Sequence, residues 1–369
     1  MKDKLGIAII GTGFARRVQI PAFRSCSDAE VVSVASGSLE NARATADEFD
    51  IGHFTDDWQE SVSNPDVDLV CITTPPVLHR EMTLFAVEKG KHVLCEKPMA
   101  MNVREAEEMT SAANRAGEIA MIDHELRFLP GRQRAYKMLR DGAIGKVRHA
   151  KYNFRASYRG NPDLPWNWWS DAEQGGGALG AIGSHIVDSL MWFLDTEITS
   201  VYCQLNAHFA ERRDREGVAR PVTADDEANM LFSFANSDLT ENATGLAACS
   251  TSEPPEYMNR VEFFGSDGSM RVDNLGELYI ASKSDSEWKR VEVDESIATS
   301  ANDNGFSLAF KYIAPKIVDA IRDGKKAVDG AATFADGVKV QRVLDAARES
   351  AASRGVTSVE CASVSSSSR

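Results

Sequence analysis

The first 123 residues alternate short apolar runs with amphipathic stretches, and this alternation limits the possible folds more than any other feature of the chain. We expect strands at 5–10, 31–35, 69–72, 92–96 and 119–122, and helices at 39–49, 76–89 and 103–116. Strands that are apolar throughout are typical of a parallel sheet with both faces covered, and short strand–helix connections favour a doubly wound order. The pattern therefore predicts a doubly wound parallel α/β domain over residues 1–123.

After residue 123 the pattern changes, because strands now follow one another directly. A helix is expected at 130–140, and strands at 147–157, 198–208, 228–234, 245–250, 259–264 and 269–273. The turn Gly265-Ser266-Asp267-Gly268 predicts a hairpin between the last two strands. Helices at 306–322 and 333–350 are expected to close a second α/β domain, residues 124–360, with a large, mainly antiparallel open sheet. The serine-rich residues 361–369 are expected to be a disordered tail.

Charge and cysteine spacing argue against several kinds of partner. The net charge of −14 repels phosphate backbones and anionic lipid surfaces, so we expect neither a nucleic-acid nor a membrane partner. No run approaches the roughly 20 apolar residues that a membrane span requires. The six cysteines lack the close spacing of a zinc site or a disulfide framework, which predicts no metal site and reduced thiols in a cytoplasmic protein.

A glycine pair follows the first expected strand directly, in the segment Gly11-Thr12-Gly13-Phe14-Ala15. The first glycine permits a tight turn there, and the second lets the backbone approach a pyrophosphate at a helix N-terminus. Because the pair comes after a first strand and the chain then alternates correctly, it indicates a Rossmann dinucleotide-binding site rather than a structural turn alone.

The end of the second strand bears on which dinucleotide binds. An NAD site usually has a carboxylate about 20 residues after the glycines, where it accepts from the ribose 2′-OH. This chain has Ser36-Gly37-Ser38 in that place. Without a carboxylate a 2′-phosphate is not repelled, and Arg16, Arg17 or Arg43 would supply positive charge, so we favour NADP over NAD. The simpler interpretation is that the turn is structural and that Ser38 caps the next helix.

The segment Glu96-Lys97-Pro98 follows the fourth strand, at the edge where open α/β sheets bind ligands. The proline restricts the backbone of Lys97, so the ammonium group is aimed rather than free in solvent. A positively charged nicotinamide nearby would favour the neutral amine, which suits proton exchange with a substrate hydroxyl. Lys97 is therefore the first candidate catalytic residue.

A second candidate is His185, which follows the glycine run Gly175-Gly176-Gly177 near the start of an expected helix. Asp188 comes three residues later on the same helix face and is expected to orient the imidazole. A lone histidine is often only structural. The glycine context gives a ligand access to the backbone, which leaves a catalytic role open for His185 beside the structural one.

The segment Pro165-Trp166-Asn167-Trp168-Trp169 is unusual for a loop. With Arg155 close by, Trp166 and Trp168 would suit stacking on the C–H face of a sugar and bonding to its hydroxyls. Anchoring of the loop in a core or a subunit interface is an equally good explanation. Asp123, at the end of the first domain, is the remaining candidate for substrate binding.

Taken in order, these motifs resemble the Gfo/Idh/MocA family of oxidoreductases. The resemblance rests on Gly11-Thr12-Gly13-Phe14, Thr73-Thr74-Pro75, Glu96-Lys97-Pro98, Arg127-Phe128 before Pro130, and the glycine run followed by Gly183-Ser184-His185 and Asp188. It spans nearly the whole chain and implies a Rossmann domain followed by an α/β domain whose open sheet often mediates oligomerisation, here as a homodimer or homotetramer.

The resemblance also implies roles for individual residues. Lys97 and His185 would face the reactive carbon, and Thr73, Thr74, Pro75, His79 and Glu96 would line the cofactor beside Lys97. The family commonly has an aspartate four residues before the histidine, where this chain has Ala181. His185 would then have to carry more of the proton relay.

Together these features predict an NAD(P)-dependent dehydrogenase or reductase acting on a secondary alcohol or ketone of a sugar, sugar derivative or cyclitol. Lys97, directly or with His185, is expected to accept the hydroxyl proton, while the hydride chemistry belongs to the cofactor. A catalytically weak dinucleotide- or sugar-binding regulator is the alternative, which only Ala181 favours. A lyase-like or hydrolytic use of bound NAD, in which the hydride moves out and back, is a second enzymatic alternative.

Overall fold

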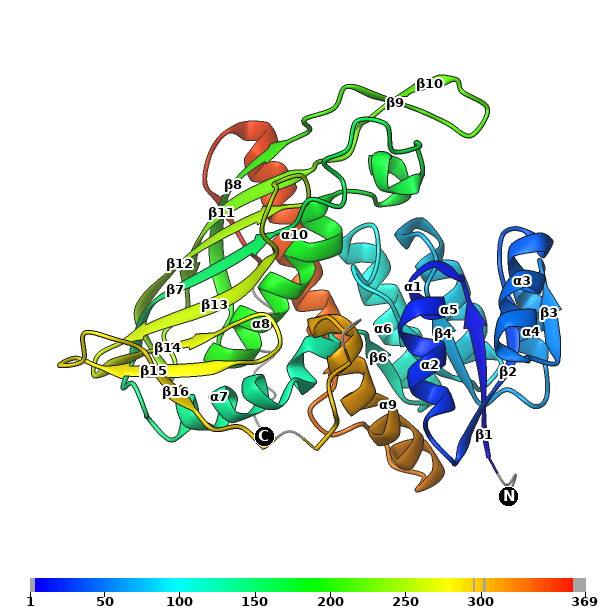
Figure 1. The fold of residues 1–369 in the computed structure, drawn as a ribbon, viewed down its shortest axis with the longest axis horizontal. Coiled ribbons are helices and arrows are strands. Elements are labelled where there is room, and N and C mark those ends of the chain that lie inside the picture. Colours follow the sequence, from blue (N-terminus) through cyan, green and yellow to red (C-terminus); the bar gives the residue numbers. More distant parts are fainter. Residues whose placement is uncertain (1–3, 295, 301–302, 361–369) are drawn as a thin grey trace, which may run out of the picture.

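The computed structural model (Figure 1) describes residues 4–294, 296–300 and 303–360, and its N-terminal part alternates strands with helices. The strands are β1 (Leu5–Ile10), β2 (Ala29–Ala35), β3 (His53–Thr55), β4 (Leu69–Ile72), β5 (His92–Cys95) and β6 (Ala120–Ile122). The helices are α1 (Gly13–Arg17), α2 (Gln19–Arg24), α3 (Leu39–Phe49), α4 (Trp58–Ser63), η1 (Pro76–Leu78), α5 (His79–Glu88) and α6 (Val103–Ala116). The predicted tail at 361–369 lies outside the described residues.

The C-terminal part contains the longer strands. Its helices are η2 (Glu125–Phe128), α7 (Pro130–Arg140), η3 (Trp168–Ser170), η4 (Ala172–Gln174), the π-helix η5 (Leu179–Gly183), α8 (Ser184–Leu194), α9 (Gly305–Arg322) and α10 (Phe334–Ser353). Its strands are β7 (Val147–Arg155), β8 (Ile198–Asn206), β9 (Glu211–Arg213), β10 (Ala219–Pro221), β11 (Glu227–Phe234), β12 (Thr240–Ser250), β13 (Met258–Gly265), β14 (Gly268–Val272), β15 (Leu278–Ser282), β16 (Lys289–Val291), β17 (Ala332–Thr333) and β18 (Thr357–Ser358).

The strands form two large sheets, which confirms the predicted fold class. In the first sheet, of order β17-β6-β5-β4-β1-β2-β3, strands β1 to β6 are parallel to their neighbours, and β17 pairs antiparallel with β6. The second sheet has the order β16-β15-β14-β13-β7-β12-β11-β8-β18 and is antiparallel except between β7 and β12. The predicted hairpin at residues 265–268 joins β13 to β14. Figure 1 shows the two large sheets side by side, with α10 running between them.

Local sequence signals define the ends of the helices. The side chain of Asn102 accepts from the backbone N–H of Glu105 at the start of α6, and Gly117, with φ of +77°, follows its last turn. α10 begins with a reciprocal pair of hydrogen bonds between Thr333 and Asp336. Such caps satisfy backbone groups that a helix end leaves unpaired. The boundaries of α6 lie where the sequence pattern predicts them, and so do those of α3 and α7.

The expectation that both terminal helices close the second domain is wrong for α9. Its Phe310 meets Phe23 of α2 edge-on at 5.4 Å between ring centroids, in a core with the strands of the first sheet. α10 instead lies between the two halves, since Phe334 and Val338 belong to the core of the first sheet and Val343 to that of the second. An amphipathic stripe shows that a helix is packed, but it does not say against which sheet.

The segment Ala172–Leu194, which ends in α8, corrects another expectation. By length and composition it is apolar enough to cross a membrane. However, 94% of its apolar stretch is buried inside the fold, as in the central helix of a folded domain. The hydrogen bond from Nζ of Lys97, just after β5, to the carbonyl oxygen of Ala181 places the turn before α8 against the carboxyl edge of the first sheet.

Candidate active site

The β1–α1 loop has the geometry that a dinucleotide requires. Gly11 has φ of +95°, and a Cβ there would lie 2.5 Å from the carbonyl oxygen of Thr73. A Cβ on Gly13 would meet nothing within 4 Å, so this backbone faces an open cradle. Only glycine therefore fits at position 11, and a diphosphate can approach the loop at position 13. The residues present fit a dinucleotide.

The loop after β4 lies next to this cradle and is tied to it. Oγ of Thr73 donates to the carbonyl oxygen of Ile10 at 3.0 Å. His79 is fully buried, with Nε2 2.9 Å from the carbonyl oxygen of Thr74 and Nδ1 3.1 Å from that of Pro98. His79 therefore holds the loop of Thr74 and Pro75 against the turn at Pro98, rather than presenting its ring to a ligand.

The turn after β2 brings together the residues expected to select the dinucleotide. Oγ of Ser38 accepts from the backbone N–H of Asn41, so Ser38 does cap α3, as the simpler interpretation holds. A Cβ on Gly37 would meet nothing within 4 Å, which leaves the turn between Ser36 and Ser38 open. Arg43, exposed in α3, lies over the ring of Phe54 at 5.3 Å. No residue from 36 to 38 contributes a carboxylate.

Lys97 lies at the carboxyl end of β5 and reaches across to the second half of the chain. Its Nζ donates to the carbonyl oxygen of Ala181 at 3.1 Å and lies 3.9 Å from Oε2 of Glu96. It also lies 6.0 Å from the centroid of the Phe14 ring, in the glycine loop. The ammonium group of Lys97 thus has a fixed direction, as expected. It donates to the backbone carbonyl of Ala181, the position at which the family commonly has an aspartate.

His185 lies in the first turn of α8, only 2% exposed, and faces another imidazole. Its Nδ1 is 3.4 Å from Nδ1 of His124, and its ring lies 5.1 Å from that of Phe306. Its Nε2 has no hydrogen-bond partner among the residues that the structure describes. Burial, with the nearby charge of Lys97, lowers the pKa of His185 well below its usual value.

The expectation that Asp188 orients His185 is wrong. Asp188 accepts two hydrogen bonds from Arg127, from Nε at 2.9 Å and from Nη2 at 2.5 Å. Nη1 of Arg127 also lies 3.5 Å from Asp336 of α10. A guanidinium binds a carboxylate through two parallel bonds more strongly than an imidazole can through one. Asp188 therefore anchors α8 to the segment after β6, and so positions His185 only through the backbone.

A buried group of acids lies beneath Lys97. Nε2 of Gln19 donates to Oε1 of Glu96 at 3.2 Å and to Oδ2 of Asp123 at 2.8 Å. Asp123 and Glu125 are fully buried, and burial raises the pKa of each well above its usual value. Burial also raises the pKa of Glu96. Asp123, predicted to bind substrate, instead lies in this layer behind Lys97.

The three other candidate substrate residues have different surroundings. Arg155 ends β7 and pairs with Glu256 at 3.1 Å, in a hollow of the second sheet apart from Lys97 and His185. Nε1 of Trp166 donates to the carbonyl oxygen of Pro221 at 3.0 Å, so this ring anchors its loop to the β9–β10 hairpin. The backbone of Trp168 packs against the glycine run, since a Cβ on Gly176 would lie 2.5 Å from its carbonyl oxygen, and its ring lies 5.4 Å from that of Trp169.

Sequence reasoning missed His124, Gln19 and Glu125 and gave Arg127 no role of its own. The run Asp123-His124-Glu125 directly follows β6, at the same edge of the sheet as Lys97, and this position in the fold was the signal that could have identified them.

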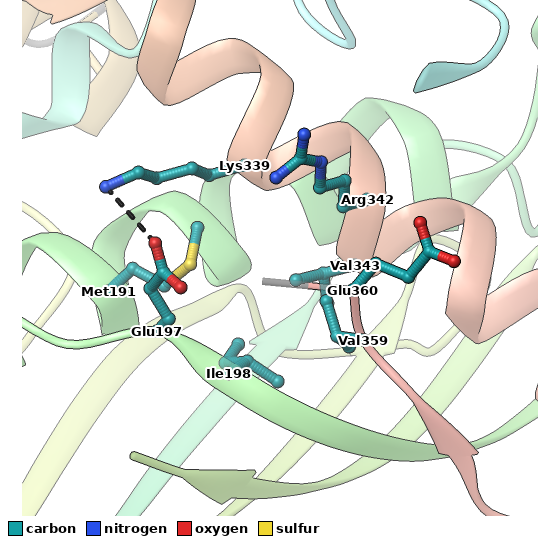
Figure 2. A pocket seen from close by; sticks show the side chains of 8 residues that line it. All are labelled: Met191, Glu197, Ile198, Lys339, Arg342, Val343, Val359 and Glu360. Carbon is teal, nitrogen blue, oxygen red and sulfur yellow. Dashed lines mark ion pairs between the residues drawn. The ribbon is translucent and has the colours of Figure 1, made fainter. Parts of the chain in front are cut away.

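Figure 2 shows a separate small pocket beside α10, where Lys339 pairs with Glu197 at 3.5 Å. None of the candidate site residues lines that pocket.

An open glycine cradle, an aimed lysine and a buried histidine thus meet at the carboxyl edge of a parallel sheet, which defines an oxidoreductase that binds a nicotinamide dinucleotide. Residues 5–124 match the oxidoreductase family with an NAD-binding Rossmann fold. Residues 132–271 match the GFO/IDH/MocA C-terminal domain. The chain belongs to the GFO/IDH/MocA family, which confirms the resemblance seen in its motifs.

Similar proteins include sugar dehydrogenases. A levoglucosan dehydrogenase of Pseudarthrobacter phenanthrenivorans is 29% identical over 387 residues, which cover 95% of this chain and 97% of that protein. An uncharacterised oxidoreductase of Synechocystis is 36% identical over 234 residues, 63% of this chain and 63% of that protein. A solved structure of levoglucosan dehydrogenase in complex with NADH and levoglucosan superposes with a TM-score of 0.87 at 26% identity, covering 97% of this chain and all of that one.

Proposed function

We propose that the protein is an NAD(P)-dependent dehydrogenase or reductase acting on a secondary alcohol or ketone of a sugar, sugar derivative or cyclitol. The observation that carries this proposal is the convergence of Lys97, which follows β5 and lies beside Phe14 of the glycine loop, with His185 at the start of α8. The similar levoglucosan dehydrogenase, solved with NADH and levoglucosan, supports the substrate class.

The residues of the site have separate roles in binding the substrate and in moving its proton. A bound dinucleotide supplies the hydride acceptor, so the protein has to bind the sugar and move the hydroxyl proton. Lys97 donates to the carbonyl of Ala181, which holds its Nζ at the mouth of the site, while Nε2 of His185 is buried and unpaired. Lys97 therefore binds the substrate oxygen, and the proton passes to Lys97 or to the lone pair of His185. Trp168, partly exposed, offers a ring to the sugar.

We propose NADP as the preferred dinucleotide. The turn of residues 36–38 has no carboxylate, and Arg43, which is exposed beside it, has no ion pair among the described residues. Arg16 is the weaker candidate for the phosphate, because it pairs with Glu48. The NADH found with levoglucosan dehydrogenase supports the other choice, so both dinucleotides have to be compared.

We also propose that the protein works as a homo-oligomer in the cytoplasm. Leu231 of β11 is 51% exposed, and in the sheet it lies between Leu246 of β12 and Tyr202 of β8, each 37% exposed. Such an apolar row suits contact with a second copy of the same face. The five cysteines that the structure describes are unpaired thiols, which supports a reducing environment.

The direct test is a panel of sugars and cyclitols, each with NAD and NADP, followed by nicotinamide absorbance. Net reduction with at least one sugar is expected. Tight dinucleotide binding without reduction by any substrate would support the regulator instead. Turnover of a substrate without net reduction would support the lyase-like use of NAD.

A further inference from the structure

Two buried imidazoles face each other at the site. The Nδ1 atoms of His124 and His185 are 3.4 Å apart, with the ring planes at 77°, and both residues are 2% exposed. Burial lowers the pKa of His124 to about 4 and that of His185 well below its usual value, so both rings are neutral near neutral pH. A hydrogen bond between two neutral Nδ1 atoms needs a proton on one of them and a lone pair on the other.

The surroundings of His185 indicate which ring carries that proton. If His124 donated, the proton of His185 would sit on Nε2, a buried atom with no hydrogen-bond partner in the described part of the chain. A buried N–H without an acceptor is rarer and costlier than a buried lone pair without a donor. The charge of Lys97, which faces His185, also favours a lone pair over an N–H there. His185 is therefore the donor and His124 the acceptor.

We propose that His124 is a positioning residue that accepts the Nδ1 proton of His185 and so fixes the tautomer with a lone pair on Nε2, the ring nitrogen that takes up the substrate proton. This inference rests on the proposed role of His185. On oxidation the substrate O–H bond breaks and its proton bonds to Nε2 of His185, while the electron pair of that bond forms the C=O bond. The C–H bond breaks at the same carbon, and its electron pair leaves as the hydride that a bound oxidised dinucleotide would accept. The resulting imidazolium keeps its Nδ1–H donated to His124, which stabilises it.

Several charges face the pair from the elements packed around it. Lys97 from the end of β5 and Arg132 from α7 lower the pKa of His185. Arg127 and Lys97 lower the pKa of His124, while Asp188 from α8 and Asp336 from α10 raise it. Because Asp188 and Asp336 are already bound by Arg127, burial outweighs them and both rings stay neutral.

The tautomer is measured by ¹⁵N NMR on protein labelled at histidine, in the wild type and in His124→Phe and His124→Gln. We expect the Nδ1–H form of His185 in the wild type and in His124→Gln, whose amide oxygen can accept the same proton. In His124→Phe, which has no acceptor, we expect the Nε2–H form that isolated histidine prefers. His208, an exposed histidine whose Nε2 lies 3.0 Å from Oε2 of Glu227, provides the matched control His208→Gln.

Steady-state kinetics of the same variants provide a second test of the role of His124. His124→Phe should lower kcat by about 10- to 100-fold with little change in KM, and His124→Gln should restore much of it. His208→Gln should behave as the wild type. The Nε2–H form of His185 in the wild type would overturn the inference even if the enzyme oxidises sugars. The Nδ1–H form in a protein that turns over no substrate would instead count against the proposed function.

Discussion

Acid should destabilise this protein through His124. The ring is buried, which lowers its pKa to about 4, whereas in the unfolded chain it has a pKa near 6.5. Between these values the unfolded chain binds a proton that the folded protein does not, so the folding stability falls as the pH falls. The contribution of His124 is nearly intact at pH 7 and decreases by about 2.5 kcal/mol on going to pH 4.5.

The assay is urea unfolding at several pH values between 7 and about 4.5 for the wild type and His124→Gln, which cannot be protonated. Asp123 and Glu125, whose raised pKa values act in the opposite direction, are the same in both proteins. The difference between the two curves therefore reports the loss of His124 together with any change that this loss causes in the pKa of its neighbour His185. The variant should lose about 2.5 kcal/mol less than the wild type over this range. Parallel curves would show that His124 is not held neutral by the fold.

Four further predictions follow from the site and the sheet. Lys97→Ala should lower turnover by about 100- to 10,000-fold with dinucleotide binding retained; a rate within a few-fold of wild type would refute the role of Lys97. Ser36→Asp should shift preference from NADP toward NAD, and tighter binding of NAD by the wild type in a fluorescence titration would contradict the proposed selectivity. Because the pKa of His185 is lowered, the pH–rate profile should lose activity on its acid side only below about pH 6.5. In Ala181→Asp the added carboxylate should raise that pKa and move the loss of activity to higher pH. A profile unchanged both in this variant and in His185→Asn would mean that the histidine is structural. Leu231→Asp should dissociate the oligomer in light scattering, and a wild type that is already a monomer would contradict the proposed assembly.

Much of the fold was predictable because its signals are local. The apolar runs of β1 and β4 and the capped helices α3 and α6 lie where the pattern places them, since burial on both faces and helix caps show in a few consecutive residues. The short strands β9 and β10 were missed, because their side chains are mostly exposed and show no apolar alternation.

The site was predictable where glycine or proline restricts the backbone. Gly11 and Lys97 could be chosen from sequence because a tight turn and a proline act on the residue beside them. The sequence placed Asp188 correctly on the helix face that carries His185, but it predicted the wrong hydrogen-bond partner for it. Spacing along one helix puts it on the same face as His185, but the helix cannot show that Arg127, 61 residues earlier in the chain, offers it a better bond.

The chain's local chemistry thus determined the two sheets, the dinucleotide loop and the pair Lys97 and His185. Only the tertiary structure decided what surrounds that pair: the carbonyl of Ala181 on Lys97, the ring of His124 on His185 and the acids beneath them. The physical reason is that proton-transfer properties depend on burial and on charges a few ångströms away. Those neighbours come from strands and helices that are distant in sequence and meet only when both domains have packed.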